Sequence, residues 1–448
     1  MSALGNILAF DLGTSSVRAL VLDHDAVPVP GALARRKFSP TVDGDGAATL
    51  DAQAYLGALI ECVDELHAAG RLDGVAHVSA SAMWHSILPL DGAGKPLGPV
   101  LTWLDTRPRA HGRATGPDDE AAFHHRTGAW WHPLYWTVRI PWLRERSGTA
   151  PTAFSGLGEY VWSALLGEGP ISVSQASGAG VLDLAAQTWD AEALSLAGAR
   201  ESELPRLAAP GWRGRLRAEY AGRWPALADA DWAAPAGDGA ASNVGSGAGD
   251  ASRAAITVGT SAAVRIAQEA PAGASLSPLP AQLWRYRLDH TRVVTGRAYS
   301  GGGNLFAWAQ RALLLPEGDA LEAALDEIVP GQVGVWADPR FGGDRPPGMT
   351  PPGEGRLGGL GLTTTGPQIL AGLMDGVCAQ IADDLVVLES TVGRTVDVRL
   401  GGGAVAASAW WRRAFTSALA PRRVEAVDNP EVGAVGAALI MLADHPNG

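Results

Sequence analysis

An aspartate within a run of glycines is the first candidate for chemistry in this sequence. Between residues 237 and 249, five glycines accompany Asp238. Glycine lets the backbone approach a ligand closely and turn its amide groups inward, and a lone carboxylate in such a loop is a candidate general base. The same composition is typical of a Gly/Ala-rich linker, so this stretch alone supports both interpretations.

A short hydroxyl-rich motif occurs twice, each time after an apolar run that predicts a buried strand. Small turns with amides and hydroxyls at their tips suit a polyphosphate. Two such tips, one at the start of each half, predict a duplicated fold in which the tips face each other, but so short a match also arises by chance in a chain rich in Gly and Ala. The copies are Gly13-Thr14-Ser15-Ser16-Val17-Arg18 and Gly259-Thr260-Ser261-Ala262-Ala263-Val264-Arg265.

Two further glycine runs precede predicted helices. A strand predicted over residues 396–400 leads into one of them, and the helix after it begins near Trp410. A strand, three glycines and a helix make a seat for a flat nucleotide ring because no side chains obstruct it, and a tight strand-to-helix turn is the alternative. The two runs are Gly301-Gly302-Gly303-Asn304 and Gly401-Gly402-Gly403-Ala404.

Aromatic residues are concentrated between residues 84 and 142, which hold six of the 16 tryptophans. Aromatic faces stack on the C–H faces of sugars, which is one explanation, and core packing is the other. His124 and His125 lie in the same region, but no third ligand at suitable spacing accompanies them, which disfavours a metal site built on histidines.

Length and charge limit the function classes. A chain of 448 residues is typical of two domains, and a net charge of −12 disfavours non-specific binding to nucleic acid or to anionic lipid. No apolar run long enough to span a membrane occurs. With only two cysteines, Cys62 and Cys378, we expect a reduced, cytoplasmic protein, monomeric or homodimeric.

Hydrophobic periodicity indicates how these motifs are positioned. Residues 7–22 predict a β-hairpin, residues 51–69 and 369–390 predict amphipathic helices, and residues 75–80 predict a strand. Residues 431–442 predict a closing helix suited to close packing. Residues 205–235, rich in Pro, Ala, Arg and Trp with weak periodicity, are interpreted as the join between two halves.

Taken together and in order, these motifs resemble those of the FGGY carbohydrate kinases, within the sugar kinase, heat-shock and actin-like ATPase superfamily. Asp11 with Gly13–Ser16 is similar to the first phosphate motif, the Asp238 loop to the catalytic loop, Thr257 with Gly259–Ser261 to the second phosphate motif, and Gly401–Ala404 to the adenosine motif. The resemblance covers essentially the whole chain.

The resemblance implies an α/β fold of two actin-like (ribonuclease H-like) domains with duplicated topology and a central cleft. Residues 1–235 are expected to form the N-terminal domain, with the sugar site and the first phosphate motif. Residues 236–448 are expected to form the C-terminal domain, with the catalytic loop, the second phosphate motif and the adenosine motif.

Residues 81–86, 103–107, 127–128 and 132–133 resemble the gluconate-kinase branch more closely. Three features depart from the family pattern. Trp84 stands between Met83 and His85, where that branch runs straight on, and Arg139 stands where the family signature prefers lysine. Gly342-Gly343-Asp344-Arg345 replaces the commoner Gly-Glu-Arg. The first departure lies in the expected sugar pocket and leaves the choice of sugar open.

The resemblance also implies the reaction, which is transfer of a phosphoryl group from ATP to a small sugar acid, gluconate first, with Mg²⁺ as the metal. Asp238 is the implied base, with room for a substrate left by its flanking glycines, and Asp11 is the implied Mg²⁺ ligand, through water. The implied sugar contacts are His85, Trp103, Asp105, His132 and Asp238. The implied nucleotide and phosphate contacts are Gly13, Thr14, Ser15, Gly259, Thr260, Ser261, Gly302, Gly303, Asn304, Gly401, Gly402, Gly403 and Ala404.

Other functions fit the same residues. Xylulose, ribulose, glycerol or another polyol could replace gluconate as the acceptor. An ATPase of the chaperone or actin type would need no sugar, and a kinase homologue without activity would need neither base nor metal. The absence of a Gly-x-x-x-x-Gly-Lys-Ser/Thr sequence excludes a P-loop enzyme.

Overall fold

Two mixed β-sheets, one in each half of the chain, form the framework of the computed structural model, which describes residues 5–113, 116–343, 353 and 355–444. The first sheet has the strand order β12-β13-β6-β1-β2-β3, and β14 (Ala236–Gly237) also pairs with β6. Its other strands are β1 (Asn6–Leu12), β2 (Ser16–Leu22), β3 (Pro28–Lys37), β6 (Val75–Ala82), β12 (Arg213–Gly214) and β13 (Asp231–Ala233).

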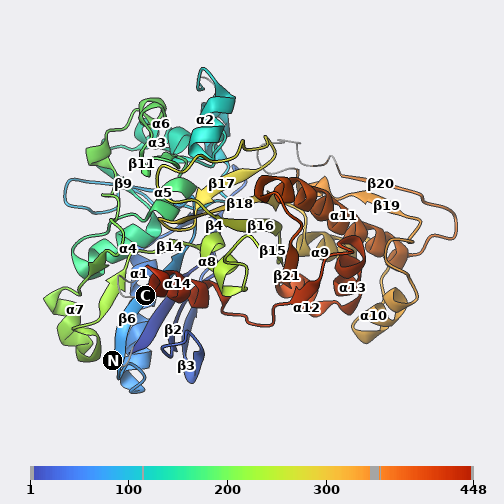
Figure 1. The fold of residues 1–448 in the computed structure, drawn as a ribbon, viewed down its shortest axis with the longest axis horizontal. Helices are drawn as coiled ribbons and strands as arrows, with labels where there is room; N and C mark the ends of the chain where they lie inside the picture. Colours follow the sequence, from blue (N-terminus) through green and yellow to red (C-terminus); the bar gives the residue numbers. More distant parts are fainter. Residues whose placement is uncertain (1–4, 114–115, 344–352, 354, 445–448) are drawn as a thin grey trace.

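The second sheet repeats this arrangement (Figure 1). Its order is β17-β18-β16-β15-β21-β22, formed by β17 (Trp284–Arg287), β18 (Arg292–Tyr299), β16 (Ala262–Glu269), β15 (Arg253–Val258), β21 (Asp397–Gly401) and β22 (Val424–Ala426). In each sheet, the first strand pairs antiparallel with the second and the second with a third, which are β1-β2-β3 and β15-β16-β18. Two later strands join in parallel on the other side of the first strand, β6 with β13 and β21 with β22. The duplicated topology expected from the repeat is therefore confirmed.

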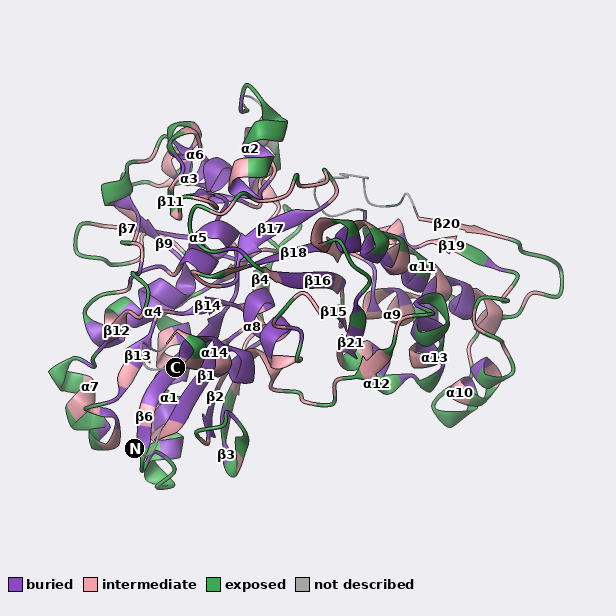
Figure 2. Ribbon diagram, viewed as in Figure 1, coloured by how far each residue is buried: buried purple, intermediate pink, exposed green. Residues whose placement is uncertain are grey.

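In each half, a long helix lies along the chain between the antiparallel strands and the first parallel strand. Helix α1 (Ala52–Ala68) begins at Asp51, whose side chain accepts a hydrogen bond from the Ala54 amide. Helix α11 (Gly366–Val392) begins with a capping box formed by Thr365 and Gln368. Both predicted amphipathic helices are confirmed, and Figure 2 shows the sheets beside them as largely buried.

Residues 205–235 are not a join between two halves, which corrects the interpretation of the sequence. They contain β12 and β13, and Trp224 and Trp232 lie fully buried in the core of the first sheet. Strands of two and three residues show no periodicity, so the pattern of this segment hid its contribution to the sheet.

Three elements connect the halves. Helix α8 (Asp238–Gly245) follows β14, and helix α14 (Val432–Ala443) returns from the second half to pack against α8, β6 and β1 (Figure 1). Strand β17 packs against α5 (Val173–Gly178) of the first half. The predicted domain boundary at residues 235/236 falls between β13 and β14.

The remaining elements lie in smaller sheets and in the connections. None of the helices in the described ranges combines the length and apolarity needed to cross a membrane. The remaining helices are α2 (Glu120–Thr127), α3 (Trp136–Arg146), α4 (Leu157–Leu166), α6 (Ala191–Ala197), α7 (Ala218–Arg223), α9 (Gly303–Ala312), α10 (Asp319–Asp326), α12 (Gly403–Ala407) and α13 (Ala409–Ala418), with 3-10 turns η1 (Arg107–Arg113), η2 (Glu201–Glu203), η3 (Pro225–Leu227) and η4 (Arg340–Gly342). The remaining strands are β4 (Thr41–Val42), β5 (Ala48–Leu50), β7 (Leu88–Leu90), β8 (Val100–Leu101), β9 (Ala153–Ser155), β10 (Leu182–Asp183), β11 (Thr188–Trp189), β19 (Trp336–Asp338) and β20 (Arg356–Gly358).

Candidate active site

Both predicted hydroxyl-rich tips are turns between the first two strands of their sheets. The first tip, residues 13–15, connects β1 to β2, and the Gly13 amide donates to the Ser16 carbonyl at 3.1 Å. The second tip, residues 259–261, connects β15 to β16, and the Gly259 amide donates to the Ser261 carbonyl at 2.9 Å. The tips are therefore equivalent in the two sheets.

The arginines at the ends of the two sequence copies are not equivalent. Arg18 pairs with Asp11, one position from the strand end, whereas Ala263 pairs with Thr257 at that position in the second hairpin. Arg265 lies two residues further along β16. Side chains on a strand alternate between faces, so Arg265 projects from the same face of its sheet as Ala263.

Three of the predicted nucleotide segments meet at one pocket of about 590 Å³ in the second half. Six predicted residues line it: Gly259, Thr260, Gly303, Asn304, Gly403 and Ala404. Backbone bonds hold the segments together, because the Gly303 amide donates to the Gly259 carbonyl at 2.7 Å and the Asn304 amide to the Thr260 carbonyl at 3.1 Å. Six more lining residues had no sequence signal: Phe306, Ala307, Arg311, Ala407, Ser408 and Trp411.

Glycine is required where these segments touch. A Cβ on Gly302 would lie 2.8 Å from the Ser261 carbonyl carbon, and one on Gly402, at φ 106°, would lie 2.4 Å from the Val258 carbonyl oxygen. Ser261, Gly302 and Gly402 thus form the contacts behind the pocket lining, and Gly401 ends β21 beside them. The helices α9 and α12 begin at the pocket, so their first amide groups favour a negatively charged ligand there.

Asp238 lies in the first turn of α8, directly after β14. Its Oδ1 accepts hydrogen bonds from the Gly239 amide at 2.8 Å and from the Trp84 amide at 3.2 Å. Burial raises the pKa of the Asp238 carboxyl, whereas the two amides and the Arg265 guanidinium lower it. Arg265 is buried, and its Nη2 donates to Thr257 Oγ1 at 3.1 Å. No sequence pattern indicated that this arginine acts on Asp238.

Asp11 lies near the end of β1, between Arg18 on β2 and Ser81 on β6. Burial raises the pKa of the Asp11 carboxyl to about 6, the Arg18 guanidinium opposes the rise, and the Asp238 and Glu431 carboxylates add to it. Arg18 also forms an ion pair with Glu431 at 2.9 Å. The two candidate carboxylates, Asp11 and Asp238, are therefore close enough to repel each other.

The surroundings of Asp11 fit a hydrated divalent cation. A Cβ on Gly433 would lie 3.2 Å from Asp11 Oδ1, so glycine keeps space free beside the carboxylate. A cation bound there would remove the electrostatic cost of the charged carboxylate. The described residues contain no group of three His, Cys, Asp or Glu side chains that could hold a metal.

Trp84 occupies the space beside the glycines of the catalytic loop. A Cβ on Gly237 would lie 1.8 Å from Trp84 Nε1, and one on Gly239 would lie 2.2 Å from Trp84 Cζ3. The indole nitrogen donates to the Ser174 carbonyl at 3.0 Å. The expectation that these two glycines leave room for a substrate is therefore wrong, because the indole of Trp84 fills that room.

The four predicted sugar contacts other than Asp238 lie on loops of the first half. His85 has the left-handed φ of 65°, and its Nδ1 lies 2.5 Å from the Gly178 carbonyl oxygen. Trp103 reaches the first tip, because its Nε1 donates to Thr14 Oγ1 at 3.2 Å.

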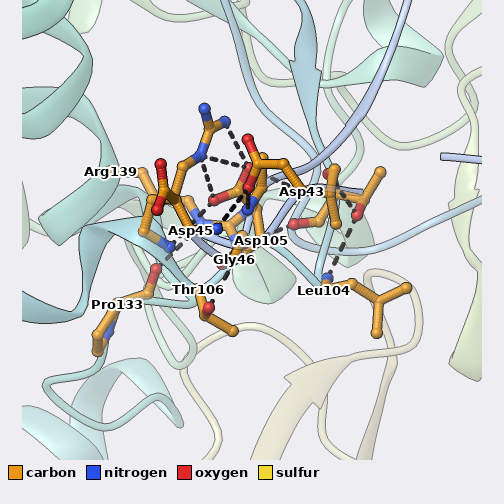
Figure 3. A network of polar contacts seen from close by, with 12 residues as sticks. Asp43, Asp45, Gly46, Leu104, Asp105, Thr106, Pro133 and Arg139 are labelled. Atoms are coloured by element: carbon orange, nitrogen blue, oxygen red, sulfur yellow. Dashed lines mark hydrogen bonds and ion pairs between the residues drawn. The ribbon is translucent and has the colours of Figure 1, made fainter. Parts of the chain in front are cut away.

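The side chains of Asp105 and His132 both accept hydrogen bonds from backbone amides. The Asp105 side chain is fully buried and accepts hydrogen bonds from the Ala48 amide and the Arg107 guanidinium (Figure 3). The His132 Nδ1 accepts from the Leu134 amide at 3.0 Å. Burial, with the charges of Arg139 and Arg109, lowers the pKa of His132 to about 3, so its imidazole is neutral.

Comparison with known proteins agrees with this geometry. The profile of the FGGY family of carbohydrate kinases, N-terminal domain, matches residues 6–245, and that of the C-terminal domain matches residues 254–443. The chain is 25% identical to a gluconokinase of Bacillus subtilis, covering 97% of this chain and 87% of that protein. It is 28% identical to a xylulose kinase of Streptomyces rubiginosus, with 96% and 86% covered.

The fold agrees as well. A crystal structure of gluconate kinase from Lactobacillus acidophilus superposes with a TM-score of 0.88 at 23% sequence identity, over 98% of this chain and 89% of that chain. The two duplicated sheets are those of the actin-like ATPase fold found in these kinases. With both family profiles together spanning nearly its whole length, the chain belongs to the FGGY family of carbohydrate kinases.

Proposed function

We propose that this kinase transfers the γ-phosphoryl group of ATP to a hydroxyl group of a small sugar acid, with gluconate as the first candidate. The observation that supports the proposal best is the convergence of the predicted nucleotide segments on one pocket in the second half. The two candidate carboxylates lie at strand ends of the first half, where the charge of Asp238 helps to raise the pKa of Asp11.

Asp238 acts as the general base. As the acceptor oxygen bonds to the γ-phosphorus, the hydroxyl proton passes to the Asp238 carboxylate and the bond to the ADP oxygen breaks. The Trp84 and Gly239 amides both hold Oδ1, so we assign the proton to Oδ2. The raised pKa of this carboxyl makes it a better proton acceptor than an exposed aspartate.

Asp11 holds Mg²⁺ through water in this proposal. Bound there, the ion would neutralise charge on the phosphates. The tips at residues 13–15 and 259–261 bind the phosphates through their amides and hydroxyls, and Gly302–Asn304 and Gly401–Ala404 surround the nucleotide. Trp103 of the acceptor site donates a hydrogen bond to Thr14 of the first phosphate tip, so the two sites lie next to each other.

The comparisons do not distinguish between sugar acceptors, because a gluconokinase and a xylulose kinase resemble this chain to a similar degree. Residues 81–86 and 103–107 favour a sugar acid through their resemblance to the gluconate-kinase branch. A ketose or a polyol as the acceptor is the second candidate, and the space taken by Trp84 next to Asp238 distinguishes this site from the family pattern.

The test is ADP formation from Mg-ATP against a panel of aldonates, ketoses and polyols, each compared with a reaction without acceptor. The expected result is ADP release well above the basal rate with one or more aldonates, and a phosphorylated product in stoichiometric amount. Release that no acceptor stimulates would instead identify a sugar-independent ATPase. No release at all would identify an inactive homologue.

A further inference from the structure

Arg139 on helix α3 is a fully buried cation held by backbone carbonyls. Its Nη1 donates to the His85 carbonyl at 2.7 Å, and its Nε to the Pro133 carbonyl at 3.0 Å. Its Nη2 donates to the Thr102 carbonyl at 2.9 Å and to the Asp105 carbonyl at 3.2 Å. Figure 3 shows Arg139 beside Pro133 and Asp105 in this network.

The four carbonyls belong to three separate loops, and each loop carries a predicted acceptor contact. The first is the loop at residues 83–87, with His85, the second is residues 102–107, with Trp103 and Asp105, and the third is residues 130–134, with His132. We call them the three acceptor loops. The hydrogen bonds of Arg139 therefore join all three loops at one group, its guanidinium.

The second loop extends this network to the phosphate side. Trp103 follows Thr102 directly, and its indole holds the Thr14 hydroxyl of the first tip at 3.2 Å. Thr102 Oγ1 in turn donates to the Ala48 carbonyl at 2.8 Å. The position of the Thr102 carbonyl therefore affects both the acceptor side and the first phosphate tip.

An arginine suits this arrangement. The planar guanidinium offers five donors in a fixed fork, so it can bind several carbonyls in different directions at once. Lysine has three donors around a single nitrogen, so it could not donate a separate hydrogen bond to each of the four carbonyls that Arg139 binds. Burial lowers the pKa of Arg139 to about 10, so the group stays charged at neutral pH.

The four hydrogen bonds of Arg139 go to backbone carbonyls and not to a carboxylate. The Asp105 carboxylate raises the pKa of Arg139 through its charge, but this carboxylate is hydrogen-bonded to Arg107. A buried cation satisfied only by carbonyls fixes the orientation of those peptides strongly, because any shift would leave the charge unsolvated.

We infer that Arg139 is the positioning residue for the sugar acceptor, holding the three acceptor loops in the one arrangement that binds it. The inference rests on the proposed function, since it concerns the acceptor of that reaction. The four hydrogen bonds of Arg139 go neither to residues that line the nucleotide pocket nor to Asp238, so it acts on the acceptor through His85, residues 102–107 and the His132–Pro133 turn.

The test is Arg139→Lys, which keeps the positive charge and removes the fork. With the best acceptor from the panel, we expect the acceptor KM to rise about 10-fold or more, because small displacements of positioning groups have effects of that size. The KM for ATP should stay within about 2-fold of the wild-type value, since the nucleotide pocket lies in the other half.

Arg285→Lys is the matched control. Arg285 is equally buried and also binds a backbone carbonyl, that of Ser277 at 2.8 Å, but its guanidinium contacts none of the three loops. We expect both variants to lose comparable thermal stability and only Arg139→Lys to change the acceptor KM. Amide hydrogen exchange by mass spectrometry should be faster in the three acceptor loops of Arg139→Lys alone.

Three results would overturn the inference. One is an unchanged acceptor KM in folded Arg139→Lys, and another is an equal rise of the KM values for acceptor and ATP. The third is a variant that fails to fold while Arg285→Lys folds, because Arg139 would then support the first half as a whole. A wild-type protein that phosphorylates no acceptor would instead refute the proposed function, and hydrogen exchange in the three loops would still test the positioning role.

Discussion

At the scale of single residues, the site depends on the balance between burial and nearby donors. Burial raises the pKa of Asp238, whereas two amides and the Arg265 guanidinium lower it. Asp11 has fewer compensating partners, so its pKa rises to about 6. The proposed base, Asp238, and the proposed metal ligand, Asp11, are thus the same residue type but differ in the groups that surround them.

The first prediction concerns Asp238→Asn. We expect kcat to fall by about 10²–10⁴, with the KM for ATP largely unchanged, because the asparagine keeps the hydrogen bonds to Oδ1 and loses only the proton acceptor. Asp250→Asn, an exposed aspartate in the loop after α8, is the control and should behave as wild type. Steady-state kinetics decides, and near-normal turnover in Asp238→Asn would remove it as the base.

The second prediction concerns the stability of ligand-free Asp11→Asn. The folded-state pKa of Asp11, about 6, exceeds the ordinary value of 3.8, so this group stabilises the folded state at low pH and the stabilisation is lost as the pH rises through 6. At pH 8 the charged carboxylate is unfavourable, and its removal should stabilise the protein by up to about 3 kcal/mol.

The measurement for Asp11→Asn is thermal unfolding between pH 4 and 8 without metal. The gain should shrink as the pH falls below about 6, the folded-state pKa, and should be mostly gone near the ordinary value of 3.8. Arg18 keeps its ion pair with Glu431 in the variant, so no charge is left unpaired. Asp25→Asn, an exposed position, serves as the control. A variant less stable than wild type at pH 8 would contradict the unfavourable burial of Asp11.

The third prediction concerns the contact between Gly237 and Trp84. Gly237→Ala should destabilise the protein by about 1–3 kcal/mol, since a Cβ would overlap the indole, and should lower kcat. In a Trp84→Ala background the same change should cost less, which a double-mutant cycle by urea unfolding measures. Gly57→Ala, in open space on α1, is the control. Additive free energies would show that the two residues do not interact.

At the scale of elements, α8 and α14 carry the site through close packing. A Cβ on Gly436 would lie 1.7 Å from the Ala241 carbonyl oxygen, and one on Gly245 would lie 1.9 Å from that of Val432. Asp238 opens α8, and Gly433 in the first turn of α14 faces Asp11. The packing of α14 against α8 therefore determines where Gly433 lies beside Asp11.

The fourth prediction follows from this packing. Gly436→Ala should push α14 away from α8, destabilise the protein by about 1–3 kcal/mol or more, and raise the Mg²⁺ concentration needed for half-maximal activity. Gly222→Ala on α7, where a Cβ meets no neighbour, is the control. Urea unfolding and a Mg²⁺ titration are the measurements. If the variant needed the same Mg²⁺ concentration as the wild type, the position of α14 would have no effect on the metal site.

At the scale of the whole molecule, the two halves share a firm contact at β17. The Arg285 amide donates to the Gly128 carbonyl at 3.1 Å, the Arg287 amide to Ser177 Oγ at 2.8 Å, and the Tyr135 and Tyr286 hydroxyls lie 2.6 Å apart. The phosphate tips belong to different sheets. A polyphosphate that contacts both tips would draw the sheets together, with the β17 contact as the fixed side.

The fifth prediction tests this closure. Small-angle X-ray scattering should give a smaller radius of gyration with a non-hydrolysable ATP analogue and acceptor together than with either alone, because only the pair fills both halves of the site. Asp238→Asn should close in the same way, since it keeps the binding groups. An unchanged radius with both ligands would mean that catalysis needs no movement of the halves.

Much of this arrangement was predictable from local patterns. The hairpin over residues 7–22, the helix over residues 369–390 and the repeated tips are each encoded by neighbouring residues, because strand and helix periodicity and turn composition are local properties. The order of Asp11, Asp238, the second tip and Gly401–Ala404 along the chain was enough to indicate the family that the profiles confirm.

What depends on residues far apart in sequence required the tertiary structure. Arg265 acts on Asp238, Arg139 joins three loops, and α14 returns to the first sheet. Trp84 fills the space over Gly237 and Gly239, which lie more than 150 residues later in the chain. Sequence determined which residues could do the chemistry, and folding alone decided their neighbours, because burial, pKa and available space depend on which distant segments pack together.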